Sequence, residues 1–577
     1  MPRSIPASFF AAAIALSFIS YACASDKGPT MEVRISKDRK HILFGSELSM
    51  AIVEKDTPLV KRIVAEKPQL INKAEGYHKI TPLHEASSAD NTEAVELLLA
   101  SGANIEAADR DGLTPLCVSA SLRMAELLLA KGARTDVGIE GGKTILHVAA
   151  GRIKSGRGLV EFFVKKGMSP NAKDEEGETP LFCAARNSAE AVGVLLDLGA
   201  DPNVLDKRGR APLMAAIYSN NVGAASRLIQ SGADVNVVPK YGGAPIHYAE
   251  STEMVELLVK NGADANSRDA SGNTPLFRAR KADVIGQLIK NGADVNAQNG
   301  IGQTALQDIC FTGKFDCVKK MIDSGADPSI ADSQSRTPMF SIAACEIYDR
   351  DTEEKLIGLK NRIDIIDLLL AKHANVNARD RRGLTPIFDA REPEIADHLV
   401  AKGATLLIKD NDGMLPIHYS RTKKMAEYYV SKGMDVNAKD NNGYTPLIMS
   451  VVRDPETVEY FLSKGADANA MGFGKRGGCQ TPLMAAIDFG REEAVKLLVK
   501  NGARVNLKDP GTGNICLHLA AMNKNVKIVE FLLASGADPE ARNNLGQTAL
   551  DVAMEKNNAG IASVLKGAQK SAPGSKK

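Results

Sequence analysis

The stretch GLTPLCVSASLRMAELLLAKGARTDV (112–137) decides the fold, because ITPLHEASSADNTEAVELLLASGANIE (80–106) states nearly the same pattern before it. Both stretches contain Thr-Pro-Leu, then three consecutive leucines, then Gly-Ala. The two threonines, Thr81 and Thr114, are 33 residues apart. A pattern that returns at this interval is typical of a repeat array, in which each unit packs on its neighbours, and not of a few separate globular domains.

The Thr-Pro-Leu anchor, or a close variant of it, recurs along nearly the whole chain. Successive anchors are 30 to 36 residues apart, except for one interval of 48. The anchors start at Thr81, Thr114, Thr144, Thr179, Ala211, Ala244, Thr274, Thr304, Thr337, Thr385, Leu415, Thr445, Thr481, Ile515 and Thr548. Residues 46–80 have both helical patterns but lack the turn that precedes the first helix in the other units, as a terminal cap repeat does. The sequence therefore predicts about 16 units, with a cap at 46–80 and the array at 81–565.

Each unit has the pattern of two helices followed by a turn. Thr is a good N-cap residue and Pro fits the first helical position, so the anchor predicts the start of a short, Ala-rich helix. A second helix carries Val and paired leucines, as over 94–98, and a Gly such as Gly102 ends it in a left-handed conformation. An Asp-x-x-Gly turn, as at 109–112, then forms the tip of a hairpin finger.

These residues resemble the ankyrin repeat family, whose motif T-P-L-H-x-A…V-x-L-L-L-x-x-G-A-D-x-N covers about residues 46–565 here. The resemblance implies an all-α repeat solenoid of stacked helix-turn-helix units with β-hairpin fingers. It also implies a concave face, lined by first helices and finger tips, that binds other proteins.

Three departures from the regular repeat stand out. Five intervals are 30 residues long, and the position of the following Gly places the deletion around the turn between the two helices. In the 48-residue interval the extra residues fall near 346–363 and carry a helical stripe, so we expect an N-terminal extension of the second helix, with Asp351 and Glu354 as its capping pair. This insertion either buttresses the neighbouring repeat or offers a ledge to a partner. The insertion AMGFGKRGGCQ (470–480) predicts one long finger.

Several motifs resemble ligand-binding sequences, but their context does not support a ligand site. The glycines of 472–477 match G-x-G-x-x-G, but a dinucleotide site needs a βαβ unit, which paired helices do not supply. GRIKSGRG (151–158) lacks the Gly-Lys-Ser/Thr ending of a phosphate loop. Five histidines share one position after the anchor: His84, His147, His247, His418 and His518. Stacked helices lie about 8–10 Å apart and zinc–ligand bonds measure about 2 Å, so we expect these histidines to hydrogen-bond within their turns. We predict no cofactor and no metal site.

Residues 1–24 have the pattern of a secretory signal peptide. Arg3 precedes the apolar run 9–19, and Ala22-Cys23-Ala24 gives a small-x-small cleavage pattern. The run is too short for a membrane span, which needs about 20 residues. Cys23 is also a candidate for lipidation, although Ser20 occupies the place where bacterial lipoprotein signals carry an aliphatic residue. We expect export to the periplasm or cell envelope, with release from the cell as the alternative, and a short segment at 25–45 before the cap.

Net charge and cysteine spacing further limit the classes of function that the chain can have. Lys and Arg total 72 and Asp and Glu total 70, so the net charge of +2 gives no footprint for nucleic acid. The eight cysteines include no C-x-x-C or zinc spacing, and most are expected to be buried, with Cys479 in the Gly-rich finger as the exposed thiol. The tail 566–577 is predicted to be disordered and basic.

The sequence thus predicts a secreted or envelope-located, non-catalytic scaffold that binds partner proteins through its concave face. The alternative is an exported effector or toxin-like protein that acts on a host protein or membrane. Tip residues that vary between repeats are the candidates for partner binding, since Tyr and Arg most often anchor interfaces. They are Arg110, Lys207, Arg208, Tyr241, Arg381, Arg382, Tyr444, Phe473, Lys475 and Arg476.

Overall fold

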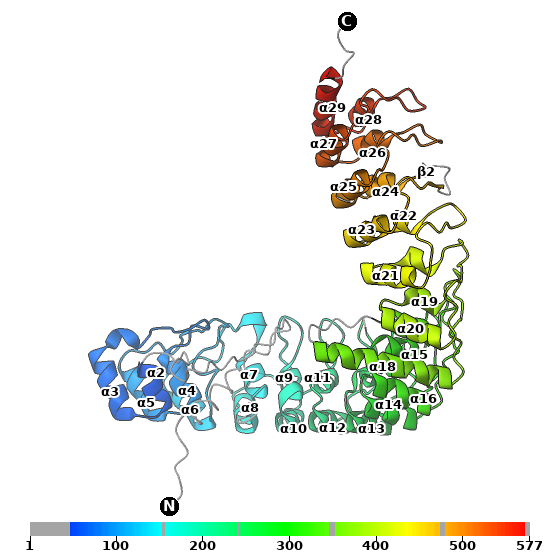
Figure 1. Ribbon diagram of the computed structural model, residues 1–577. Coiled ribbons are helices and arrows are strands. Elements are labelled where there is room, and N and C mark those ends of the chain that lie inside the picture. Colours follow the sequence, from blue (N-terminus) through cyan, green and yellow to red (C-terminus); the bar gives the residue numbers. More distant parts are fainter. Residues whose placement is uncertain (1–46, 153–155, 241, 346–351, 474–478, 572–577) are drawn as a thin grey trace, which may run out of the picture. The chain divides into compact units, whose positions relative to one another are not determined.

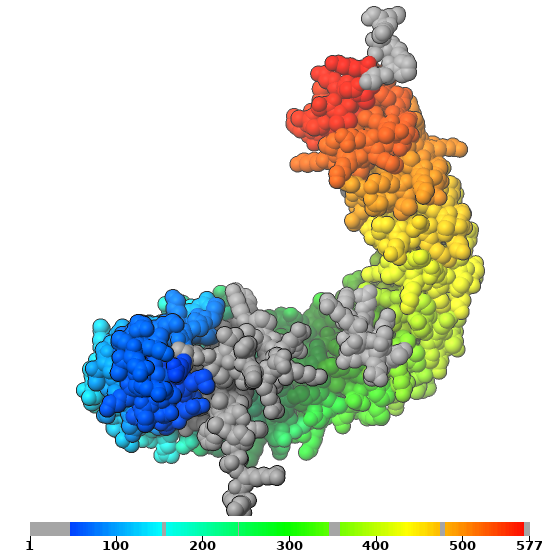
Figure 2. All heavy atoms as spheres, turned by 60° about the vertical axis from the view of Figure 1, so that its left-hand side comes forward, coloured from blue at the N-terminus to red at the C-terminus, as the bar shows by residue number. Residues whose placement is uncertain are grey.

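The computed structural model describes residues 47–152, 156–240, 242–345, 352–473 and 479–571. These residues divide into two compact units. Unit 1 holds the described residues up to 270 together with 290–292, and unit 2 holds 271–289 and the described residues from 293 onward. Within each unit, paired helices follow one another along the chain (Figure 1), and successive repeats pack directly on each other (Figure 2). The expected signal peptide and the segment 25–45 lie outside the described residues.

One repeat shows why the pairs form. Helix α4 (Pro82–Ser88) begins with Pro82 at the position where a missing N–H costs nothing. Helix α5 (Thr92–Ala100) follows after Asn91, whose side chain accepts a hydrogen bond from the N–H of Ala94. The two helices bury Leu83, Ala86, Ala94, Val95 and Leu98 almost completely, and Gly102 then ends the pair at a φ of 92°.

Unit 1 repeats this arrangement. Its first helices are α2 (Glu47–Val53), α4, α7 (Ile145–Ala150), α9 (Pro180–Asn187), α11 (Pro212–Tyr218) and the single turn η3 (Pro245–Tyr248). Its second helices are α3 (Thr57–Glu66), α5, α6 (Leu122–Ala130), α8 (Gly156–Lys165), α10 (Ala189–Asp197), α12 (Val222–Gln230) and α13 (Thr252–Lys260). Two further single turns, η1 (Pro68–Leu70) and η2 (Glu140–Gly142), lie in its loops.

Unit 2 continues the same order. Its first helices are η4 (Pro275–Phe277), α15 (Ala305–Phe311), α17 (Pro338–Ala344), α19 (Pro386–Asp389), η5 (Pro416–Tyr419), α22 (Pro446–Ser450), α24 (Pro482–Asp488), α26 (Cys516–Met522) and α28 (Ala549–Glu555). Its second helices are α14 (Ala282–Lys290), α16 (Phe315–Asp323), α18 (Thr352–Ala371), α20 (Pro393–Ala401), α21 (Lys423–Ser431), α23 (Pro455–Ser463), α25 (Glu492–Lys500), α27 (Val526–Ala534) and α29 (Ala559–Ser571). The all-α repeat solenoid predicted from the sequence is confirmed.

The 30-residue repeats differ from the expectation that the helix–helix turn is shortened. Their second helices keep nine residues, as α13 and α20 do, whereas their first helices shrink to the single turns η3, η4, α19 and η5. The repeat that starts at Thr114 has turns in place of a first helix. The deletion therefore removes helix from the first element, whereas the second helix keeps its buried apolar side chains, as α13 keeps Met254, Val255 and Leu258.

Two further expectations need correction. Thr304, Thr481 and Thr548 cap their helices as predicted, but the hydroxyls of Thr179, Thr274, Thr337, Thr385 and Thr445 are buried without a hydrogen-bond partner. Thr suits the anchor mainly because a β-branched residue favours the extended backbone found there, as in Thr385 with φ −114° and ψ 167°. The tail is not disordered from 566, since α29 continues to Ser571.

Both insertions have regular structure in their described parts. Helix α18 has 20 residues, against nine for α16, and begins at Thr352. The proposed capping pair lies at its start, where Asp351 and the Glu354 side chain are outside the described residues. In the long finger, β1 (Gly472–Phe473) pairs antiparallel with β2 (Cys479–Gln480). Most other described fingers are turns, closed by a backbone hydrogen bond such as the one from the Asp109 N–H to the Leu113 carbonyl.

Candidate functional site: the inner face

We define the inner face of each unit as the side of the first helices and finger tips. Buried polar side chains three residues after the anchor tie its neighbouring repeats together. His84 Nδ1 accepts a hydrogen bond from the Thr81 N–H (3.3 Å), and Nε2 lies 2.9 Å from the carbonyl oxygen of Leu113 in the next repeat. The same pair of contacts is made by His147, His418 and His518. The bond within the turn was predicted, and the bond to the next repeat was not.

The environment of these histidines suits a structural role. Nε2 faces a carbonyl oxygen, so it carries the proton and Nδ1 is the acceptor. Burial lowers the pKa of all four imidazoles, which keeps them neutral near pH 7. The described part of the chain holds no group of three or more His, Cys, Asp or Glu side chains placed to bind a metal ion.

A second ladder joins the loops that follow the second helices. Asn203 Nδ2 donates to the Gly232 carbonyl (2.9 Å), and its Oδ1 accepts from the N–H of Asp234 (2.9 Å). The same pair of bonds is made by Asn72, Asn171, Asn296, Asn377, Asn437, Asn469 and Asn506. Each accepting Gly closes the next second helix, whose last carbonyls lack helical partners. Sequence reasoning missed this ladder, although Asn recurs at this place in the repeats, after Ala-Asp-x in the case of Asn203, Asn296 and Asn469.

Three predicted binding residues are exposed on the fingers of unit 1: Arg110, Lys207 and Arg208. The N–H of Arg110 donates to the His78 carbonyl, and the N–H of Lys207 donates to the Glu176 carbonyl, so consecutive finger tips are joined by backbone bonds. The backbone of these tips is therefore structural, while the side chains are available for contact.

One of these side chains has a neighbour that the sequence did not suggest. The Arg110 guanidinium lies 3.8 Å from the ring centroid of Tyr77, an exposed tyrosine on the preceding finger. Such stacking holds the cation over an aromatic face at the surface. The predicted residues Tyr241, Lys475 and Arg476 lie outside the described residues.

In unit 2, Arg381 and Arg382 are exposed at a finger tip. The Arg381 N–H donates to the Gln334 carbonyl and joins two fingers. The Arg382 guanidinium donates to the Tyr419 hydroxyl (2.8 Å), which itself donates to Asp410 Oδ2 (2.8 Å). Arg382 is thus brought into contact with the first helix of a later repeat.

Tyr444 and Phe473 have different roles, although both were predicted to bind a partner. The Tyr444 ring is half-buried and packs on Gly472, where an added Cβ would lie 2.9 Å from the ring. Tyr444 therefore supports the long finger. Phe473 is exposed on β1, and its N–H donates to the Asn442 carbonyl (2.7 Å).

The clearest unpredicted feature of the inner face is a row of exposed apolar side chains where first helices end. They occupy equivalent positions, six to eight residues after the anchor, and are between 41% and 58% exposed. This apolar row consists of Phe311, Phe489, Met522 and Met554 in unit 2, and Tyr218 has the equivalent position in unit 1. Aromatic and Met side chains are enriched in the cores of protein interfaces, so their repetition on one face favours protein binding.

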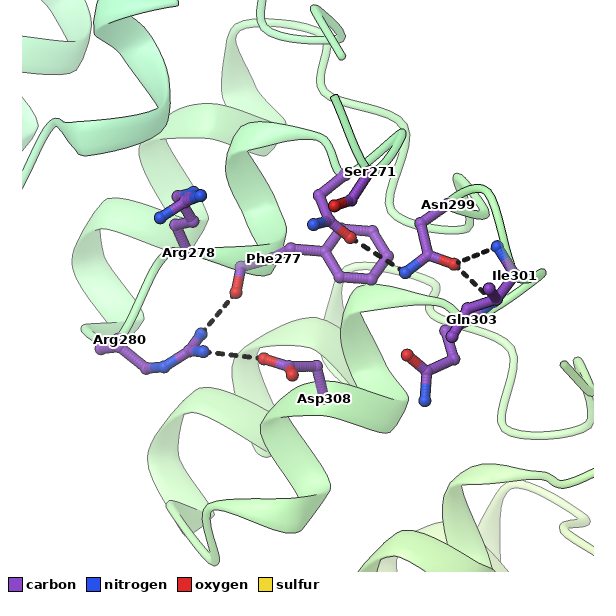
Figure 3. Close-up of a pocket in the computed structure, with 9 residues that line it drawn as sticks. Ser271, Phe277, Arg278, Arg280, Asn299, Ile301, Gln303 and Asp308 are labelled. Atoms are coloured by element: carbon purple, nitrogen blue, oxygen red, sulfur yellow. Dashed lines mark hydrogen bonds and ion pairs between the residues drawn. The ribbon is translucent and has the colours of Figure 1, made fainter. Parts of the chain in front are cut away.

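A cavity of about 420 Å³ opens on the inner face of unit 2. Its lining is mostly polar and comprises Ser271, Asn273, Phe277, Arg278, Arg280, Asn299, Ile301, Gln303 and Asp308 (Figure 3). The first helix here is the single turn η4, whereas the adjacent α15 has seven residues, so the missing helix leaves space. Arg280 donates to the Phe277 carbonyl (2.6 Å) and to Asp308 Oδ2 (2.8 Å) at one side of this space (Figure 3). The cavity can take a polar side chain of a partner.

Arginines also satisfy carbonyl groups in the shortened repeats. Arg152 Nη2 donates to the Val118 carbonyl (2.8 Å), and Arg453 Nη1 donates to the Ser420 carbonyl (2.9 Å). Each arginine belongs to the repeat that follows the shortened one. Because a truncated helix leaves its last carbonyls without partners, a cation is favourable at these points. The shortened repeats thus bring positive charge to the inner face.

Four guanidinium groups gather over the repeats that start at Thr337, Thr385, Leu415 and Thr445. This arginine cluster consists of Arg336, Arg382, Arg421 and Arg453. Arg336 forms an ion pair with Asp389, and its guanidinium lies 4.8 Å from the Phe340 ring centroid. Burial raises the pKa of the Asp389 carboxyl, against the favourable charges of Arg336 and Arg421. Burial and the charge of Arg421 lower the pKa of the Arg453 guanidinium.

The extended helix α18 has its own polar anchor. The Arg362 side chain is fully buried, with Nη1 2.7 Å from Glu392 Oε2 in the next repeat. Further along α18, Asp367 accepts contacts from His398 (2.7 Å) and Lys402 (2.9 Å) of α20. These contacts agree with the buttress alternative for the insertion.

The cysteines are packing residues. Six of the seven described cysteines are buried and Cys183 is half-buried. The expectation that Cys479 is exposed was wrong, because the strand pairing of the long finger covers its side chain, which is 8% exposed. Among the described helices, none combines the length and the apolar character that crossing a membrane requires.

Comparison with known proteins agrees with this geometry. The family model for ankyrin repeats (3 copies) matches residues 48–139, 123–206, 146–239, 188–269, 213–299, 276–380, 390–472, 421–509 and 483–573. These matches cover most of the chain, which therefore belongs to the ankyrin repeat family. Arrays of this kind are scaffolds for protein–protein interaction, with extended binding surfaces.

Individual relatives match only short stretches. An ankyrin repeat protein of fowlpox virus (strain NVSL) is 43% identical over 77 residues, which are 13% of this chain and 23% of the viral protein. BRCA1-associated RING domain protein 1 of Caenorhabditis elegans is 40% identical over 74 residues, 13% of this chain and 10% of that protein. Human palmitoyltransferase ZDHHC17 is 37% identical over 79 residues, 14% of this chain and 12% of the enzyme. This chain thus spans less than a quarter of the length of each of these relatives. The matched stretches identify no catalytic domain in it.

Proposed function

We propose that this protein is an exported, non-catalytic scaffold that binds one or more partner proteins with its inner face. The observation that carries the proposal is the apolar row, because large apolar side chains are left exposed at equivalent positions of separate repeats. Burial of apolar surface is worth about 25 cal/mol per Å², so such a row stabilises a complex once a partner covers it. The side chains of Arg110, Lys207, Arg208, Arg381, Arg382 and Phe473 at the finger tips add polar and aromatic contacts.

The location is part of the proposal. The charged start, the short apolar run and the Ala22-Cys23-Ala24 pattern support export to the periplasm or envelope, with Cys23 as a site for a lipid anchor if it is retained. The intact mass of the protein purified from the cells that make it tests this directly. A mass that corresponds to a start after Ala24 supports export without a lipid. A start at Cys23 with an added acyl mass supports an anchor, and an uncleaved chain overturns the export proposal.

Partner binding is tested by affinity capture with chemical crosslinking, using the full chain as bait in its own cells. The test bait carries Tyr218→Ser, Phe311→Ser and Phe489→Ser. The control bait carries Leu205→Ser, Val238→Ser and Leu407→Ser, which remove exposed apolar side chains from loops after second helices. A partner held by the original and control baits and lost from the test bait supports the proposal. A partner held equally by all three baits contradicts it.

A further inference from the structure

Three guanidinium groups of the arginine cluster, those of Arg382, Arg421 and Arg453, form no ion pair with a carboxylate of the described residues. Asp389 and Asp410 lie beside these arginines, with Asp380 and Asp412 close by, and both Asp389 and Asp410 already have partners. Asp389 pairs with Arg336. Asp410 Oδ2 accepts from the Tyr419 hydroxyl (2.8 Å), and its Oδ1 accepts backbone N–H groups of its own finger.

Two of the four arginines therefore have unused capacity for an anion. Arg421 is exposed and makes no ion pair or hydrogen bond through its guanidinium with any described residue. Arg453 donates one N–H to the Ser420 carbonyl. The positive charge of Arg421 acts on Arg453, and burial weakens the hydration of Arg453, so a carboxylate between them would relieve both costs.

In unit 1, by contrast, arginines on the inner face are paired with carboxylates. There Arg186 lies 2.5 Å from Glu178 and Arg210 lies 2.7 Å from Asp206, so two arginines meet two carboxylates. The unpaired arginines of unit 2 are a local property, since the whole chain has a net charge of only +2.

We propose that the arginine cluster binds an extended, acidic segment of a partner protein, in which Asp or Glu side chains enter between Arg382, Arg421 and Arg453. Guanidinium groups bind carboxylates with two parallel hydrogen bonds, which gives both affinity and direction. The Tyr419 ring, packed 5.4 Å from Phe388, backs this surface and adds an aromatic contact. The inference rests on the proposed scaffold function and names the chemistry of the partner.

The arrangement also sets the spacing of the acidic side chains. Stacked helices lie about 8–10 Å apart and an extended chain rises about 3.3 Å per residue, so every third residue of the segment meets the next repeat. The intervening carboxylates Asp389 and Asp410 disfavour a continuous phosphate backbone, whereas a peptide with spaced acidic residues can avoid them.

The test measures fluorescence anisotropy of a labelled (Glu-Gly-Ser)5 peptide with the full chain at low salt. The uncharged (Gln-Gly-Ser)5 peptide is the ligand control. We expect the Glu peptide to bind at least tenfold more tightly than the Gln peptide.

Arg421→Glu is expected to weaken the binding of the Glu peptide at least tenfold, and Arg421→Gln is expected to weaken it less. Lys423→Glu is the matched control, because it makes the same charge change on an exposed side chain at the start of α21 in the same repeat, and it should change affinity less than twofold. Circular dichroism and thermal melting check that each variant folds.

Three results would overturn the inference: no binding of the Glu peptide, equal weakening by Arg421→Glu and Lys423→Glu, or equally tight and Arg421-dependent binding of a single-stranded DNA of similar charge. The scaffold proposal is tested separately by the capture experiment. A captured partner that is lost with the apolar-row bait and retained with Arg421→Glu leaves the scaffold standing and overturns the acidic-segment inference.

Discussion

The imidazole Nε2 of His84 lies 2.9 Å from the carbonyl oxygen of Leu113, 29 residues further along the chain. Together with the bond from the Thr81 N–H to Nδ1, this contact makes one buried side chain join its own turn to the next repeat. In the repeat that starts at Thr304, Gln307 makes the equivalent pair of hydrogen bonds. Its side chain accepts from the Thr304 N–H (2.8 Å) and donates to the Arg336 carbonyl (2.5 Å).

The first prediction uses this natural equivalence. His84→Gln should retain both hydrogen bonds and nearly all stability at pH 7.5, whereas His84→Leu should lower the free energy of unfolding by about 1–3 kcal/mol, because it leaves a buried N–H and a buried carbonyl without partners. Urea denaturation followed by circular dichroism measures both. Equal losses in the two variants would show that packing, and not hydrogen bonding, fixes this position.

The same histidines predict the response to acid. Burial lowers the folded-state pKa of His84, His147, His418 and His518 below the usual value of 6.5, so the unfolded chain binds more protons than the folded one below that pH. Their contribution to stability is complete above pH 6.5 and is lost as the pH falls through and below that value. Melting temperatures at pH 7.5 and 5.5 should therefore differ less for the His84→Gln chain than for the original. The exposed His78→Gln is the control and should leave the difference unchanged.

Glu85 of α4, in the repeat after the N-terminal cap, predicts the opposite trend. Burial raises the pKa of its carboxyl from 4.5 to about 7, opposed by a hydrogen bond with Ser49 of α2. A raised carboxyl pKa gives stability below pH 4.5 that is lost as the pH rises through 7. Glu85→Gln should therefore stabilise the chain by on the order of 2 kcal/mol at pH 8 and have little effect at pH 4.5. The exposed Glu126→Gln should have no such pH-dependent effect, and a Glu85→Gln chain that gains nothing at pH 8 would contradict the assignment.

The asparagine ladder predicts a local cost. Asn203→Ala removes the bonds to the Gly232 carbonyl and the Asp234 N–H, and should cost about 1–2 kcal/mol. Asn187→Ala removes a bond to the Cys183 carbonyl within its own helix and should cost less. Hydrogen exchange should report faster exchange at Asp234 in the first variant, and unchanged exchange there would argue against the ladder.

Thiol chemistry tests the corrected view of the cysteines. Burial raises the pKa of Cys183 to about 11 and of Cys516 to about 12, and it also raises the pKa of Cys479. Since the thiolate is the reactive form, these cysteines should react slowly with Ellman's reagent at pH 8 and rapidly in denaturant. A single thiol that reacts fast in the folded protein, traced to Cys479, would restore the original expectation.

Much of this structure follows from the sequence because each repeat carries its own capping, packing and turn residues. The anchors, the Leu pairs and the closing Gly residues predict the helices and their order, and the stripe before Leu370 predicts the extended helix α18. The sequence did not show that the 30-residue repeats lose their first helix, since Pro275 and Pro416 still mark where a normal helix would start. Nor did it distinguish Tyr444, which packs on Gly472, from Phe473, which is exposed, because both are aromatic residues of neighbouring fingers.

The apolar row was missed for a related reason. Tyr218, Phe311 and Met522 stand at the ends of first helices, where a single apolar residue has the same sequence pattern as a core residue. Only the structure shows that these side chains remain between 41% and 57% exposed.

The most direct test of the central claim is site-specific photo-crosslinking in the cells that make the protein. A benzophenone amino acid replaces Phe311 or Phe489 on the inner face, or Lys319 or Lys496 on the second helices α16 and α25 of the same repeats. We predict adducts with a partner protein from Phe311 and Phe489 and none from the two lysine positions. Adducts from Lys319 and Lys496 with none from Phe311 and Phe489 would contradict the assignment of the inner face as the binding surface.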